Sequence, residues 1–376
     1  MKLPAHRVGL FDHETLLFIL CPLAPPTRRG SRDTVRLLFL SMLNFILKRT
    51  GSLAFTVLGM SLLMFLISRT LPGDPARAAA GGIDASVEMV QHTIKEYGLD
   101  KPLIIQYFIY MKHLLRGDFG RSLVTRRPII EDLKIFYPAT FELTFYGILF
   151  ACVVGIPLGI LSAIRRGKWI DHLSRVASLF MVAMPLFWLG LMAIFIFYAK
   201  LGLFPGGGRL SYDLVTVRTI TGILTLDAIL LRDFELFKDA VYHLILPMII
   251  LSSISLGIIA RMTRSCMLEV MGENYIITAR AKGLTERGVI MKHALRNAVI
   301  PVITVVGLQF GILMGGAVIT ETVFSWPGVG RYAILSVDNK DFPAIMGFAI
   351  SFSFLYAIIN LIIDILYAFI NPKISY

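Results

Sequence analysis

The sequence lacks the short motifs by which many proteins bind nucleotides or hydrolyse substrates. It contains no G-x-x-x-x-G-K-[ST] motif, and its only Gly-Lys pair, Gly167-Lys168, is followed by Trp169. Because that glycine-rich loop is what cradles nucleotide phosphates, we expect no ATP-binding P-loop on this chain. H-E-x-x-H and G-x-S-x-G are also absent, and no cluster of catalytic groups gathers at one depth. We therefore predict that the chain is not an enzyme and has no catalytic, cofactor-binding or metal-binding residues.

Cysteine and charge are both scarce. Cys21, Cys152 and Cys266 are isolated from one another, so neither a disulfide framework nor a cysteine metal site is predicted. Charged residues make up 16% of the 376 residues and hydrophobic residues 56%, with a mean hydropathy of +0.72. This composition is typical of a polytopic membrane protein. The net charge of +12 does not indicate nucleic-acid binding, because the basic residues cluster between apolar segments rather than among aromatic residues.

The first forty residues differ from the rest. The apolar run at 15–24 is too short to cross a bilayer, which needs roughly twenty residues. Asp12 and Glu14 stand where the basic region of a signal peptide should be. We predict that residues 1–41 form a disordered or interfacial N-terminal extension, and Met42 is an alternative start for the ordered chain.

Six apolar segments are predicted to cross the membrane as helices. They are residues 50–67, 140–164, 174–199, 241–261, 298–319 and 343–370. The short loop after the second segment carries Arg165, Arg166 and Lys168, which the positive-inside rule places in the cytoplasm. The same rule places both chain termini in the cytoplasm and the glycine-broken loop 200–240 outside. We divide the orderly chain into a first helix with an extracytoplasmic helical segment, 42–139, and a five-helix core, 140–376.

Local patterns predict further detail. Two amphipathic helices, at 87–97 before Gly98 and at 104–111 after Pro102, should pack on the outer mouth of the bundle. Pro247 favours a kink in the fourth span. A small-residue face in the fifth span is suited to contact between helices; it consists of Gly307, Gly311, Gly315 and Gly316.

Several isolated polar residues lie in or near the predicted spans. Asp364, with Asn360 one turn earlier, should point into the bundle, either as a structural polar contact or as a proton-coupling group. Glu142 is predicted to lie in the first turn of the second span, where negative charge suits the helix dipole. His243 and His293 are single histidines at membrane edges and are interpreted as interfacial.

The stretch 269–301 is the most basic connection in the chain and is predicted to be cytoplasmic. Residues 275–282 favour a short helix, Gly283 stands where a left-handed residue would end it, and Thr285 can cap the next helix. Such a helix is about 12 Å long and needs a surface to dock on. The residues alone also allow an ordinary basic loop.

The run YIITARAKGLTERGVIMKHALRNAVIPV at 275–302 resembles the cytoplasmic EAA loop of ABC importer permeases, in the form of the dipeptide and oligopeptide subfamily. Further stretches look like that subfamily's first permease subunit, and the resemblance covers 42–376. They are LPGDP at 71–75, YGLDKPL at 97–103, RGDFGRS at 116–122, RMTRSCMLEVMGENY at 261–275 and TETVFSWPGVGR at 320–331.

The resemblance implies an all-α polytopic membrane protein with the six-helix bundle of type I (MetI-like) permeases. In that family the EAA loop forms a coupling helix that seats in a groove of a separate ATPase subunit. By resemblance, Thr278 and Ala279 occupy the two alanine positions, while Ile277 and Arg296 stand where the general motif has glutamate and proline. Small Ala279 and Ala281 would permit close approach, and Arg280 and Lys282 would pair with acidic groups on the groove. The implied coupling residues are Tyr275, Thr278, Ala279, Arg280, Ala281, Lys282 and Gly283, supported by His293, Arg296 and Asn297.

The loop after the fifth span contains Trp326, Pro327 and Gly328. These residues are interpreted as a candidate outer gate or as an interfacial anchor on a turn.

The resemblance also implies the assembly. The chain would be one of two permease subunits of an ATP-driven importer of dipeptides or short peptides in a bacterial inner membrane, working by alternating access. It would pair with a homologous permease, two P-loop ATPase subunits that hold ATP and Mg²⁺, and an extracytoplasmic solute-binding protein. Glutathione or nickel chelates are alternative substrates, and a proton-coupled secondary transporter using Asp364 is the alternative from another class.

Overall fold

The computed structural model describes residues 31–70, 76–77, 85–211 and 219–370, and within them the chain is built of helices joined by turns, with one isolated bridge between Arg121 and Pro128. The motif LPGDP at 71–75 and residues 1–30 of the expected extension lie outside this range. Residues 31–41 form the first turns of α2. By length and composition, five helices within these described ranges can cross a membrane, or up to six if one bent pair counts as a span. The long helices are α2 Ser31–Thr70, α6 Ile129–Ile164, α10 Phe234–Met271, α13 Leu295–Val323 and α15 Phe342–Ile370.

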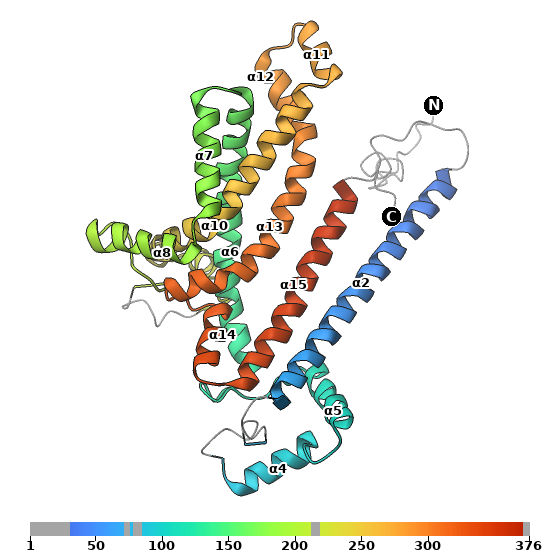
Figure 1. The fold of residues 1–376 in the computed structure, drawn as a ribbon, viewed down its shortest axis with the longest axis vertical. Helices are drawn as coiled ribbons and strands as arrows, with labels where there is room; N and C mark the ends of the chain where they lie inside the picture. The colour runs from blue at the N-terminus through green and yellow to red at the C-terminus, as the bar shows by residue number, and fades with distance from the viewer. Residues whose placement is uncertain (1–30, 71–75, 78–84, 212–218, 371–376) are drawn as a thin grey trace, which may run out of the picture.

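The third span is broken rather than continuous. α7 (Trp169–Ala183) and α8 (Leu186–Ala193), which runs on as the π-helical η2 (Ile194–Lys200), meet at an angle of 103°. Met184 adopts an extended backbone between them, and Pro185 is the N-cap of α8. The residue before a proline is disfavoured in the helical region and proline has no N–H to donate, so the helix ends here. Figure 1 shows α8 projecting sideways from the bundle instead of continuing the direction of α7.

The predicted place of Glu142 in a first helical turn is wrong. α6 begins at Ile129, with Glu131 and Asp132 in its first turn, and Pro138 lies inside the helix. Those two carboxylates, not Glu142, complement the helix dipole. Glu142 lies about three and a half turns further on and is only 2% exposed, so its charge must be met by other elements.

The core of the bundle is formed by α6, α10 and α13. A glycine pair on α6, Gly155 and Gly159, faces α10 so closely that a Cβ on Gly159 would lie 2.6 Å from the carbonyl oxygen of Ala260. Between α10 and α13, the Ser255 hydroxyl donates to Gln309 Oε1 at 2.9 Å. Gly155 and Gly159 have the small-xxx-small spacing that is typical of close helix contacts. This spacing was a signal for the tight contact between α6 and α10 that the sequence analysis did not use.

The small-residue face of the fifth span is confirmed as a helix contact, and α15 is the helix that it contacts. A Cβ on Gly307 would lie 2.9 Å from Ile363, one on Gly311 would lie 3.4 Å from Tyr356, and one on Gly315 would lie 3.7 Å from Phe352. Gly316 faces open space. α2 packs along the other side of α15 (Figure 1), where Arg49 forms an ion pair of 3.0 Å with Asp364.

The shorter helices gather at the two ends of the molecule. α4 (Val87–Tyr97), α5 (Leu103–Leu115) and α14 (Val329–Asp338) lie at one end, and α11 (Asn274–Ala281) with α12 (Glu286–Gly288) lie at the other (Figure 1). Both amphipathic helices of the outer segment are confirmed, with Gly98 as a left-handed C-cap of α4 and Pro102 as the N-cap of α5. α9 (Leu224–Leu231) precedes α10. His243 is buried within α10 at 8% exposure.

Candidate coupling site and outer turn

The basic stretch folds into the short helix that its residues predict. α11 spans Asn274–Ala281, Lys282 is its C-cap, and Gly283 follows with φ +75°. A Cβ on Gly283 would have no atom within 4 Å, so glycine is favoured by the backbone conformation and not by crowding. Thr285 caps α12 as expected, since its hydroxyl accepts from the Gly288 N–H at 3.3 Å.

The inner face of α11 belongs to the main core. Ile276 is 0% exposed and Ala279 is 6% exposed, and both pack in one cluster with Met267 of α10 and with Val289 and Ala294 of η4 (Val289–Ala294). The small size of Ala279 therefore permits α11 to approach its own bundle, and not an external surface as the resemblance implied. Because protein cores are close-packed, a push on α11 must move these neighbours with it.

The outer face of α11 is open. Tyr275 is 41% exposed and Ile277 is 56% exposed, and four further predicted residues are exposed beside them: Thr278, Arg280, Ala281 and Lys282. Where the general motif has glutamate, this chain thus presents an apolar side chain to the surroundings. The surface combines apolar area with basic groups.

The polar residues predicted around α11 have different surroundings. Arg280 forms a two-armed ion pair with Glu286, at 2.7 and 3.2 Å, so this guanidinium already has a partner within the chain. Asn297 donates to the Tyr275 hydroxyl at 2.7 Å and ties the start of α13 to α11. His293 is half-buried on η4, and Arg296 is exposed at the start of α13.

A second polar node at the same end was missed by the sequence analysis. Asp171, only 1% exposed in the first turn of α7, receives both Nε and Nη2 of Arg264 at 2.6 and 2.9 Å. It also accepts from the Ser162 hydroxyl at 2.6 Å and from the Gly167 N–H at 2.9 Å. One carboxylate thus joins α6, α7 and α10 just before α10 runs into α11. In the sequence, Asp171 could have been recognised as a candidate for such contacts because it is the single acidic residue in the basic loop RRGKWIDHLSR at 165–175.

At the opposite end, a buried carboxylate organises the turn that contains the candidate gate. Glu321 of α13 is 0% exposed; it accepts from the Thr140 hydroxyl at 2.5 Å and from the Arg331 N–H at 2.9 Å. A Cβ on Gly328 would overlap this carboxylate, and one on Gly330 would lie 2.7 Å from Val318 Cα. The WPGVG turn therefore requires its glycines because the backbone wraps closely around the buried Glu321 side chain.

Trp326 lies inside this turn. It is 1% exposed, and its indole N–H donates to the Ala139 carbonyl at 2.9 Å. A side chain so enclosed does not reach a lipid headgroup region, so the anchor interpretation fails. Trp326 instead locks the turn after α13 onto α6.

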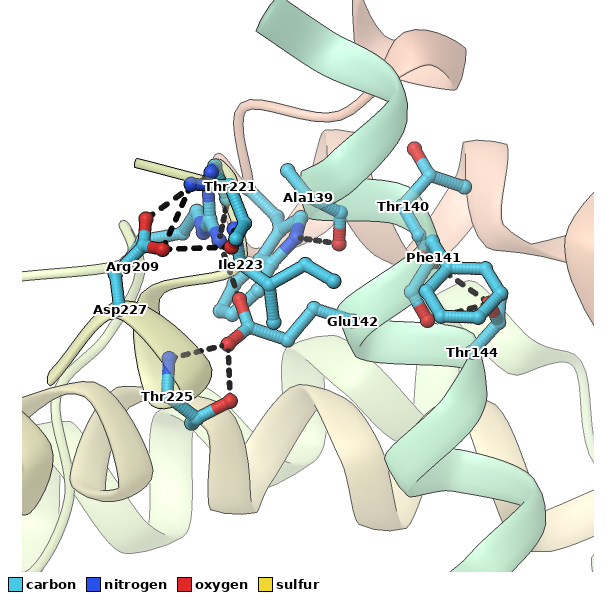
Figure 2. Close-up of polar contacts among 12 residues, drawn as sticks. Ala139, Thr140, Phe141, Glu142, Thr144, Arg209, Thr221, Ile223, Thr225 and Asp227 are labelled. Atoms are coloured by element: carbon cyan, nitrogen blue, oxygen red, sulfur yellow. Dashed lines mark hydrogen bonds and ion pairs between the residues drawn. The ribbon is translucent and has the colours of Figure 1, made fainter. Parts of the chain in front are cut away.

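Glu142 forms the neighbouring buried cluster. Figure 2 shows it reaching from α6 to Thr225, whose N–H and hydroxyl donate at 2.8 and 2.7 Å. Its other oxygen pairs with Arg209, whose guanidinium also donates to the Gly222 carbonyl at 3.0 Å and lies over the Trp326 ring. The loop between η2 and α10 is thereby fastened to α6 and to the candidate gate.

Asp227 of α9 supports the same loop. It accepts from the hydroxyl and the N–H of Thr221 at 2.6 and 2.8 Å, and from the N–H groups of Gly222 and Ile220 at 3.0 and 3.2 Å. Burial alone would raise the pKa of Asp227, but these donors outweigh it and hold the pKa below its ordinary value.

The long apolar helices define a polytopic membrane protein, with the short helix α11 exposed at one end of its bundle. The chain belongs to the family described as binding-protein-dependent transport system inner membrane component. The model of that family matches residues 155–376, and the model of its N-terminal region matches residues 42–144.

Individual relatives match nearly the whole chain. The "Probable D,D-dipeptide transport system permease protein" of Escherichia coli K12 is 48% identical over 328 residues, covering 87% of this chain and 96% of the relative. The dipeptide transport system permease protein of the same strain is 43% identical over 338 residues, with 89% and 99% covered. The glutathione transport system permease protein of Salmonella typhimurium LT2 is 39% identical over 335 residues, with 89% and 100% covered.

Among solved structures, a chain of the inward-facing MetNI methionine ABC transporter overlays with a TM-score of 0.45 at 18% identity. The overlay covers 62% of this chain and 93% of that chain.

Proposed function

We propose that this chain is a permease subunit of an ATP-driven importer that moves dipeptides or short peptides into the bacterial cytoplasm. The observation that carries the proposal is α11, whose inner face is built into the core while its apolar and basic outer face is exposed. Relatives named for dipeptide transport at 43% and 48% identity support the substrate class. A glutathione permease at 39% identity keeps glutathione as the nearest alternative substrate.

The assembly proposed for this subunit contains a homologous permease, two P-loop ATPase subunits that hold ATP and Mg²⁺, and an extracytoplasmic solute-binding protein. α11 and both chain termini face the cytoplasm. The basic composition of 269–301 supports this orientation, as does the position of α11 at the end where α2 begins and α15 ends (Figure 1).

The proposed mechanism is alternating access driven through α11. Closure of the ATPase subunits displaces α11, and Ile276 and Ala279 pass the displacement to α10 and η4 because the core between them is close-packed. At the far ends of α6 and α13, Glu321 and Trp326 join these helices to the outer turn. Movement of the helices therefore changes the packing around Trp326, Pro327 and Gly328, the proposed outer gate.

The coupling role is tested with Gly283→Asp in the complex reconstituted with its ATPase and binding-protein partners. The substitution places a negative charge and a side chain on the exposed end of α11. ATPase stimulation by the loaded binding protein and peptide uptake are both expected to fall at least tenfold. Gly117→Asp is the matched control, since Gly117 also has positive φ, +78°, and open space around its Cβ position, but lies between α5 and α6. Unchanged coupling of Gly283→Asp in a fully assembled complex would argue against the proposal.

The substrate class is tested on the cognate binding protein. Calorimetric titration with dipeptides, glutathione and nickel chelates is expected to give the tightest binding for a dipeptide. Tighter binding of glutathione would move the assignment to the alternative. Uptake into proteoliposomes that requires internal ATP and persists without a proton gradient separates an importer of this class from a proton-coupled transporter.

A further inference from the structure

α5 carries an apolar stripe that nothing else in the described chain covers. Ile104 is 72% exposed, Phe108 is 68% exposed and Leu115 is 82% exposed. Their spacing of four and seven residues places them on one face of a helix. The opposite face contacts the protein through Tyr107 and Tyr110. At 13 residues the helix is about 20 Å long, which is too short to cross a bilayer.

The attachment of α5 sets its depth in the membrane. The hydroxyls of Tyr107 and Ser61 share a hydrogen bond of 2.9 Å. Phe65, 2% exposed, packs edge-on against Tyr107 and tilted against Tyr110, at ring distances of 5.4 and 5.8 Å. Ser61 and Phe65 lie inside the apolar span Leu47–Thr70, about 14 and 8 Å before its end at 1.5 Å per residue. α5 is therefore held beside the apolar part of α2 and not beyond it.

The surface of α2 next to this attachment is apolar and is not covered by the described part of the chain. Leu62, Leu63 and Leu66 of α2 are 45%, 49% and 48% exposed within the same span. In a membrane-spanning helix such side chains face acyl chains or another membrane helix. The stripe on α5 continues this apolar surface outward.

The exposed charged residues closest to α5 are basic, and the exposed acids Asp100 and Asp118 lie one and two residues further out. Lys101 precedes the helix, Lys112 lies in its last turn and Arg116 is its C-cap, and all three are exposed. An amphipathic helix with an apolar face and flanking lysine or arginine is the arrangement that binds in the plane of a membrane interface, where the cations meet lipid phosphates.

We propose that α5 lies in the lipid interface of the leaflet opposite α11. Acyl chains cover Ile104, Phe108 and Leu115, and headgroup phosphates bind Lys101, Lys112 and Arg116. Lipid is favoured over a protein partner because the stripe lies next to the exposed apolar surface of a membrane-spanning helix, and because the attachment at Ser61 lies within that span. The bilayer surface then also fixes the height of α4 above the membrane, because the stacked rings of Tyr97 and His113 join α4 to α5.

The test uses spin labels on single cysteines in the assembled complex in nanodiscs, with all other cysteines replaced. Labels at Ile104→Cys, Phe108→Cys and Leu115→Cys are expected to be several-fold more accessible to oxygen than to a water-soluble nickel complex. Leu62→Cys on α2 is the control for lipid, and Gln91→Cys, an exposed position on α4, is the control for water.

Two outcomes overturn the proposal. Preferential access of the nickel complex at all three positions means that the stripe faces water, and protection from both reagents means that a protein subunit covers it. Uptake of peptide driven by ATP is measured on the same labelled variants reconstituted in proteoliposomes. If either of these two outcomes is found and uptake is retained, the lipid contact of α5 is refuted and the proposed transport function stands. If the labels are accessible to oxygen and uptake is lost, the lipid contact stands and only the proposed transport function is in question.

Discussion

Substitution of alanine for Gly159 tests whether the seam between α6 and α10 is as tight as the structure shows. The new Cβ would lie 2.6 Å from both the Ala260 carbonyl oxygen and the Thr263 Cβ. Carbon atoms pack at about 3.5–4.0 Å, so the helices must separate or shift by about 1 Å. Overpacking of this kind typically destabilises by about 1–3 kcal/mol, while replacing a helical glycine with alanine stabilises by about 0.5–1 kcal/mol.

The matched control is Gly316→Ala on α13, where the Cβ would meet nothing within 4 Å. This variant keeps the helix-propensity gain without the clash, so the two variants should differ in stability by about 1–3 kcal/mol. Gly155→Ala should fall between them, since its Cβ would lie 3.1 Å from the Leu256 carbonyl oxygen.

The assay is the unfolding midpoint of the purified chain in mixed micelles of increasing SDS fraction, read by tryptophan fluorescence. ATPase stimulation in the reconstituted complex is measured in parallel, and it should fall for Gly159→Ala because α10 leads directly into α11. Equal midpoints for Gly159→Ala and Gly316→Ala would refute the tight seam and, with it, the transmission of movement along α10.

Three further outcomes are expected. Asp171→Ala should lower the free energy of unfolding by about 1–3 kcal/mol because it leaves buried donors without an acceptor. Glu286→Ala, at an exposed ion pair, should leave the free energy of unfolding unchanged, and equal effects of the two variants would contradict the burial argument. Asp364→Asn should retain ATP-driven uptake, because Asp364 is paired with Arg49 as a structural contact; loss of uptake in a stable complex would favour proton coupling. Because the pKa of Asp227 is lowered in the folded chain, its contribution to stability is present above the ordinary aspartate value of 3.8 and is lost as the pH falls below it. Proteolysis of the loop 219–223, which precedes α9, should therefore rise on acidification in the native chain and not in Asp227→Asn.

The sequence by itself determined the elements whose cause is local. Hydropathy located the long membrane helices, periodicity located α4 and α5, and Gly283 and Thr285 marked the ends of α11 and α12, because capping and amphipathic patterns act within a few residues. The family resemblance of the basic stretch also came from the residues alone.

The tertiary structure decided the contacts that join distant residues. Glu142 meets Arg209 across 67 residues and Glu321 meets Thr140 across 181, so no local pattern could pair them. The same holds for the inward direction of Ala279, which depends on how α11 packs on the bundle. Local patterns state that a side chain is small, charged or apolar, but its partner is chosen only when close packing brings separate helices together.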